Sequence, residues 1–401
     1  MVAVQLKLVD AGDLYASWRW EDRLDQPRVV RVPRALVREA LDDLARAVPS
    51  PLPGEGAGEA LARSLTRGPL LDRDREVELA GRLARALVPH QLAGELNSLL
   101  ARGVRPHLRV RPSPSTALVP WEALRVDEGE RTVHTTDVSV LPPATVRNAP
   151  GRRVSPLRGP VVGVLDPRVP GFGDASGLGS VLGEVGPELA ALAAGQVPGG
   201  VRRDDVDRDF LEAALADASR LLYVGHVTTG GHGLDARLHL SCGTGTTGRA
   251  ALVGGHRPLT AADVVLGHRP GPPRPWRIPN RVALVACDSG GEARFAEPSG
   301  LVAAMVHGGA EHVVSTRWTL PTDAGLAALV PGFPGTPVLG PAVLAIDAAQ
   351  SAADPVGALN AWQRDQATRW ERTGDPAFSP VVWAAFATAW APAPAVVPAA
   401  P

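Results

Sequence analysis

Lysine and cysteine are almost absent from this sequence of 401 residues. Lys7 is the only lysine, so arginine supplies the other 40 of the 41 basic residues. With 43 glycines and 39 prolines, this composition is typical of a GC-rich bacterial genome and indicates nothing about function. The net charge is −1 with both signs mixed along the chain, so no basic face points to nucleic acid or an anionic membrane.

The two cysteines, Cys242 and Cys287, exclude a disulfide-stapled secreted scaffold and favour a reducing compartment. No CxxC pair is present, which excludes a thiolate metal cage. The N-terminus lacks a basic segment followed by an apolar one, and no apolar run reaches the roughly 18 residues of a membrane span. We therefore expect a cytoplasmic protein that neither enters nor binds a membrane.

The first 150 residues predict an α+β region that precedes the main unit. Short apolar or alternating runs predict strands in residues 1–35, and a helical stripe follows in 34–47. Two helices separated at Pro89 are expected in 76–100, and strands are expected in HLRVRP, ALVPWEAL and DVSVLPP. We divide the chain as follows: 1–75 unassigned strands and helix, 76–150 a helical and strand lead-in, 151–390 the core, and 391–401 a disordered tail.

Strands and helices alternate in the core. Apolar runs of the kind that strands buried on both faces show are VVGVL (161–165), LLYVGH (221–226), RVALVAC (281–287) and EHVVSTRW (311–318). Helices are expected over 181–194, 207–218 and 300–310, with a further short helix capped by Thr260. This order predicts an α/β domain with a mainly parallel sheet.

Two of these strands end on reactive residues, His226 and Cys287. In parallel sheets, catalytic groups gather beyond the carboxyl ends of the strands, and a nearby imidazole can convert a thiol to a thiolate. A cysteine at a strand end is also often just a small buried hydrophobic residue. Spacing alone does not show that the two strands are neighbours, so both interpretations stay open.

The sequence segments around these residues resemble those of the CHAT family, bacterial relatives of caspases and separases. LLYVGH, LTAADVV, ALVACDSGG and GLVAAMVHGGAEHVVSTRWTLPTD follow the family in order, spacing and content, and ALVPWEAL resembles its Pro-Trp-Glu-x-Leu element. The resemblance covers roughly 75–390. It implies a caspase-like, three-layer α/β/α sandwich with a mainly parallel central sheet.

The resemblance also implies a dyad, with Cys287 as nucleophile and His226 as base. The backbone N–H groups of Cys287 and Val227 would hold the oxyanion. The family usually has glycine after the histidine, whereas a branched Val227 stands here. His232, followed by glycine, is the alternative base.

Candidate substrate contacts lie at the ends of two strands. Asp166 is near the place of a primary-pocket residue in relatives and would favour a basic P1 side chain, although a strand-terminating turn is the alternative. The strand over 313–318 is a candidate for pairing with an extended substrate, with Ser315, Arg317 and Trp318 as its contacts. Core packing is the alternative for Trp318.

The resemblance implies a cysteine endopeptidase that cleaves a protein partner, without metal or organic cofactor. It further implies a bacterial defence or conflict system and a separately encoded sensor as activator. The alternative is a CHAT-like module that binds or scaffolds without cutting. Cys242 is expected to be incidental and Asp288 to cap a loop, and His239, His256, His268, His307 and His312 show no metal-ligand spacing.

Overall fold

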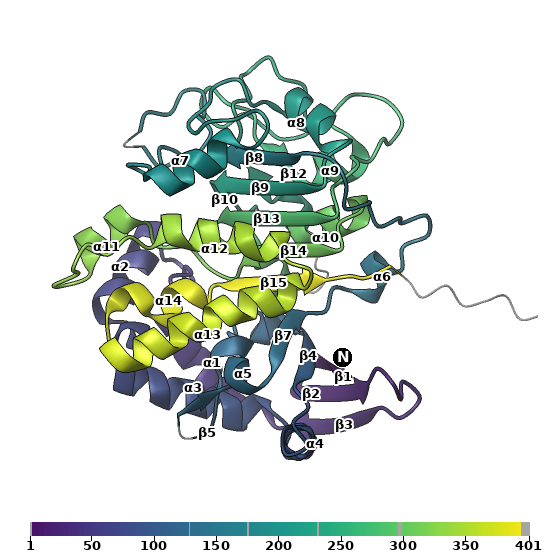
Figure 1. The fold of residues 1–401 in the computed structure, drawn as a ribbon, viewed down its shortest axis with the longest axis vertical. Coiled ribbons are helices and arrows are strands. Elements are labelled where there is room, and N and C mark those ends of the chain that lie inside the picture. The colour runs from purple at the N-terminus through teal and green to yellow at the C-terminus, as the bar shows by residue number, and fades with distance from the viewer. Residues whose placement is uncertain (1, 128, 175, 231, 296–298, 394–401) are drawn as a thin grey trace, which may run out of the picture.

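The computed structural model describes residues 2–127, 129–174, 176–230, 232–295 and 299–393. The strands of its main sheet are β1 (Val2–Ala11), β2 (Asp13–Trp20), β3 (Arg28–Val32), β4 (Pro106–Arg111), β7 (Asp137–Val140), β8 (Val161–Leu165), β9 (Arg220–Gly225), β13 (Arg281–Ala286), β14 (His312–Thr316) and β15 (Phe386–Trp390). Among the described residues, they form one 10-stranded sheet in the order β3-β2-β1-β4-β7-β15-β14-β13-β9-β8 (Figure 1). Most neighbouring pairs are parallel, which confirms the predicted α/β class.

Helices cover both faces of the sheet. They are α1 (Arg34–Ala47), α2 (Ala57–Arg67), α3 (Arg73–Leu87), α4 (His90–Leu100), α5 (Thr132–Thr135), α6 (Ala144–Arg147), α7 (Pro187–Ala194), α8 (Arg208–Leu215), α9 (Ala261–Leu266), α10 (Leu301–Gly308), α11 (Asp323–Leu329), α12 (Leu339–Ser351), α13 (Pro355–Thr373) and α14 (Pro380–Trp383). Figure 1 shows α12 and α13 crossing one face, while α9 and α10 pack together on the other. Within the described part of the chain, no helix is long and apolar enough to cross a membrane.

Strands from the first 75 residues belong to the same sheet as the core. β1 lies parallel to β4, with residues 2–7 paired to residues 106–111, and β2 and β3 continue the sheet outward as antiparallel strands. β15 joins the N-terminal strands to the core strands, because it pairs with β7 in parallel and with β14 in antiparallel. At this seam the Trp390 ring lies between the rings of His107 and His312, with centroids 5.3 and 6.2 Å away.

Two predicted elements are wrong. ALVPWEAL contains a short 3-10 turn, Trp121–Ala123, instead of a strand, because Pro120 and the buried Trp121 turn the chain there. The helix expected over 181–194 begins only at Pro187, which occupies its first turn, since Gly183 has a left-handed φ of 58°. Residues 179–186 therefore form an irregular segment, and this segment reaches the site.

Candidate active site

His226 and Cys287 follow two adjacent parallel strands, β9 and β13. The pairing of these strands runs in register from Arg220 with Arg281 to Gly225 with Ala286, so His226 and Cys287 come next on neighbouring strands. Paired residues of a parallel sheet point to the same face, and Cys287 packs in the same apolar layer as Val224 and Val285. The topology therefore brings together the two strand ends that the sequence singled out, which spacing alone could not establish.

The imidazole of His226 is oriented by a backbone carbonyl. Its Nε2 lies 2.8 Å from the carbonyl oxygen of Gly179. Because a carbonyl only accepts hydrogen bonds, the neutral imidazole must carry its proton on Nε2, and Nδ1 keeps its lone pair. The backbone of the histidine is fixed as well, since its carbonyl oxygen accepts from the Tyr223 hydroxyl at 2.8 Å and from the His239 N–H at 3.1 Å. His226 is thus held in the tautomer in which Nδ1 can act as a base.

Cys287 is half-buried in this conformation. Its Sγ lies 3.9 Å from the carbonyl oxygen of Leu320, and burial raises the pKa of the thiol. Among the described residues, the side chains of His226 and Cys287 make no hydrogen bond to each other. Burial therefore favours the protonated form of the Cys287 thiol in this conformation.

Val227 begins the short strand β10 (Val227–Thr228), which pairs with β11 (Arg237–Leu238). The bond from the His239 N–H to the His226 carbonyl makes residues 226 and 239 a hydrogen-bonded pair. Val227, one residue on, then occupies a non-hydrogen-bonded position, so its N–H points away from β11. Its side chain is buried in the apolar layer of the opposite face. The branched residue that replaces the family's usual glycine is therefore accommodated by packing, and its N–H is not consumed by the β10–β11 ladder.

Asp166 follows β8 directly and is buried, with 1% of its surface exposed. Its carboxylate accepts from the Ser180 hydroxyl at 2.6 Å and the Val181 N–H at 3.0 Å, and it forms an ion pair with Arg202 at 3.4 Å. These contacts turn the carboxylate toward residues 180–182 and leave it no exposed face for a substrate cation.

The predicted substrate contacts in β14 and just after it, Ser315, Arg317 and Trp318, are all buried. β13 pairs along one edge of β14 and β15 along the other, so the prediction that an extended substrate adds to this strand is wrong for this conformation. Trp318 is fully buried and donates from Nε1 to the Val381 carbonyl at 2.9 Å. Ser315 faces away from Cys287, because Val314 before it lies in the same layer as Cys287 and side chains alternate.

Ser315 and Arg317 border a separate cavity of about 70 Å³, with Gly290, Glu292 and Val302 on its wall. Arg317 is also tied down by Glu122 at 2.9 Å and by the carbonyl oxygens of residues 384 and 386. This volume is well below the roughly 300 Å³ at which ligand pockets usually begin.

The remaining candidates are dispersed. His232 is exposed, and Cys242 is buried in the core with the pKa of its thiol raised by burial. Asp288 forms an ion pair with Arg294 in the turn Gly291–Arg294, which braces the loop after Cys287. The groups that sequence reasoning missed are the carbonyls of Gly179 and Leu320, and no side-chain pattern could reveal them because backbone atoms make the contacts.

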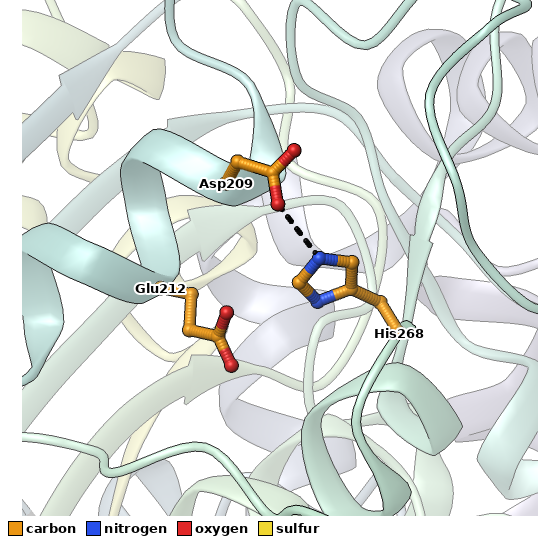
Figure 2. A group of neighbouring side chains, drawn as sticks. All are labelled: Asp209, Glu212 and His268. Atoms are coloured by element: carbon orange, nitrogen blue, oxygen red, sulfur yellow. Dashed lines mark hydrogen bonds and ion pairs between the residues drawn. The ribbon is translucent and has the colours of Figure 1, made fainter. Parts of the chain in front are cut away.

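One cluster of potential metal ligands lies elsewhere, between α8 and the residues after α9 (Figure 2). Asp209, Glu212 and His268 bring one ligand atom each within 4.8 Å of one another. Asp209 bonds His268 Nε2 at 2.9 Å and Arg269 at 2.7 Å, and Arg269 also lies 3.6 Å from Glu212. The carboxylates thus face a cation that the chain itself supplies, and the cluster acts as an ion-pair network.

Comparisons with known proteins agree with the resemblance seen in the sequence. The family described as the CHAT domain matches residues 77–390. No curated protein matches the chain. Two crystal structures of the Saccharomyces cerevisiae separase–securin complex are similar, at 9% and 10% identity and TM-scores of 0.45 and 0.46. Each similarity covers 97% of this chain and only 30% of the matched chain.

Proposed function

Because the chain belongs to the CHAT domain family, we propose that it is a cysteine endopeptidase that cleaves a protein partner with Cys287 and His226. The observation that carries this proposal is the placement of His226. It stands beside Cys287 at the ends of paired strands, with Nε2 committed to the Gly179 carbonyl and Nδ1 left as the basic nitrogen. A metal or organic cofactor has no part in this chemistry.

The reaction follows from that tautomer. The Cys287 thiol passes its proton to Nδ1, and the thiolate sulfur attacks the scissile carbonyl carbon. The N–H groups of Val227 and Cys287 hold the resulting oxyanion. Collapse breaks the C–N bond, and the proton on Nδ1 goes to the leaving amine. A water molecule, deprotonated by Nδ1, then hydrolyses the thioester and regenerates the thiol.

The resting conformation supports a switched enzyme. The Leu320 carbonyl lies 3.9 Å from Sγ, and burial raises the pKa of the thiol, so the nucleophile is mostly protonated near neutral pH. Activation requires the segment after β14 to move from Sγ so that the thiol can reach Nδ1. We infer that a separately encoded sensor supplies this movement and that the setting is a bacterial defence or conflict system.

The second candidate is a CHAT-like module that binds or scaffolds without cutting. The raised pKa of the half-buried thiol favours it, because a protonated thiol is a poor nucleophile. The retained Cys287 and His226, and the fixed tautomer of the histidine, favour the enzyme.

Labelling with a thiol-reactive peptide electrophile separates the two candidates. Cys242 is the internal control, because it is the other free thiol and is fully buried. We expect Cys287 to be labelled faster than Cys242 once proteins encoded beside this chain are added, with the label lost in Cys287→Ala and slowed in His226→Ala. If Cys287 never reacts faster than Cys242 under any of these conditions, the peptidase proposal fails.

A further inference from the structure

A chain of hydrogen bonds links Asp166, the residue that follows β8, to the candidate base His226. Asp166 adopts a left-handed conformation with a φ of 52° immediately after that strand. Its N–H donates to the Val224 carbonyl at 2.6 Å, which ties it to β9 only two residues before His226. A non-glycine residue holds such a conformation only when its surroundings determine it.

The carboxylate of Asp166 then fixes a second segment, residues 180–182. One oxygen accepts from the Ser180 hydroxyl and the other from the Val181 N–H, and the Arg202 guanidinium compensates the buried charge. Leu182 directs its N–H to the same carboxylate at 3.5 Å. A charged group with 1% exposure is stable only when it is paired and hydrogen-bonded in this way.

This segment carries the carbonyl that orients His226. The Gly179 carbonyl and the Ser180 nitrogen belong to one planar peptide unit, so fixing Ser180 and Val181 also fixes the direction of that carbonyl. A larger residue does not fit at position 179, since a Cβ there would lie 2.0 Å from the Asp174 carbonyl oxygen. The 2.8 Å contact to Nε2 is thus the end of a short rigid path that begins at the Asp166 carboxylate.

We propose that Asp166 is a positioning residue for His226: its carboxylate anchors residues 180–182 and so keeps the Gly179 carbonyl on Nε2. This role rests on the proposed function, in which Nδ1 of His226 is the base, and it replaces the role of a substrate-binding acid. The two roles predict different effects on substrates. A positioning carboxylate acts on every substrate through the base, whereas a specificity acid acts only on substrates with a basic P1 side chain.

The test compares Asp166→Asn and Ser180→Ala with Asp205→Asn, a matched control whose exposed side chain pairs with Arg203. The first readout is the ¹⁵N NMR signal of the His226 imidazole, assigned with His226→Ala. We expect an Nε2–H protected from solvent exchange in the wild type. Protection falls about tenfold or more in Asp166→Asn, falls less in Ser180→Ala and is unchanged in the control.

The second readout is peptide cleavage. A misdirected base costs about 10- to 100-fold in kcat with KM unchanged, whatever the P1 residue. The proposal is overturned if folded Asp166→Asn keeps the wild-type protection of Nε2–H, or if its loss is confined to KM for substrates with arginine or lysine at P1. If Asp166→Asn does not fold, Ser180→Ala decides alone: unchanged protection overturns the proposal.

The two readouts also keep this inference distinct from the proposed function. Absence of cleavage in the wild type, with the Nε2–H signal still responding to Asp166→Asn, refutes the peptidase and leaves the positioning role standing. Gly179→Ala gives a further check from the other end of this path, because its Cβ would collide with the Asp174 carbonyl oxygen and displace the Gly179 carbonyl while the Asp166 carboxylate is retained. We expect it to reproduce the loss of Nε2–H protection.

Discussion

Glu292 makes the stability of this protein depend on pH in a direction opposite to most carboxylates. It lies in the turn after Cys287, with 8% of its surface exposed, and accepts from the N–H groups of Val302 and Ala303 at the start of α10 at 2.8 and 3.0 Å. Burial raises its pKa to about 7, although these backbone donors oppose the shift. The carboxyl is therefore protonated in the folded protein at pH values where it is ionised in the unfolded chain.

The sign follows from linkage. A group whose folded pKa lies above its unfolded value stabilises the protein fully below the unfolded pKa, here 4.5, and this contribution is lost as the pH rises through about 7. The difference between these two values, at 1.36 kcal/mol for each pKa unit, gives a loss of about 3 kcal/mol in the free energy of unfolding. Most of that loss falls between roughly pH 5 and pH 8.

Glu292→Gln removes the titration and retains an amide oxygen for one of the helix donors. We expect urea unfolding at a series of pH values to show the wild type losing up to about 3 kcal/mol relative to this variant between pH 5 and pH 8. The difference curve cancels the contributions of histidines, which are common to both proteins. Glu188→Gln, at an exposed position in the first turn of α7, is the matched control and should follow the wild type. Parallel curves for Glu292→Gln and the wild type would refute the reasoning.

Other perturbations test the core and the seam of the sheet. Arg131→Met should lower the free energy of unfolding in urea by about 3–5 kcal/mol, because it leaves the buried Glu76 carboxylate without the guanidinium 2.7 Å away. Adding Glu76→Leu should recover most of the loss. Equal stability of the single and double variants would contradict this. Trp390→Ala should cost about 3–5 kcal/mol by opening the stack in the seam, whereas Trp390→Phe should cost clearly less. Burial lowers the pKa of His239 to about 3, so its contribution to stability falls as the pH drops below its ordinary value near 6.5. His239→Gln should therefore flatten the acid side of the urea midpoint against pH, and an unchanged slope would argue against a neutral buried imidazole.

The sequence by itself determined many of the elements and the family. Apolar runs buried on both faces marked β8, β9 and β13, helical stripes marked α1 and α3, and Thr260 caps α9 as its residue type predicts, accepting from the Asp263 N–H at 3.1 Å. These features depend on neighbours in the chain, so composition and period reveal them. His226 and Cys287 were identified in the same way, as reactive residues at the ends of such strands.

Only the tertiary structure decided what those residues face. Strand order made β9 and β13 neighbours and put the predicted substrate strand β14 in the interior, paired on both edges. The contacts that fix the candidate dyad come from carbonyl groups at Gly179 and Leu320, which every residue type possesses. Asp166 likewise looked like a specificity acid until its carboxylate was seen to bind residues 180–182. Long-range backbone contacts of this kind leave no side-chain pattern, and for that reason the sequence could name the candidate nucleophile and base but not the path that positions them.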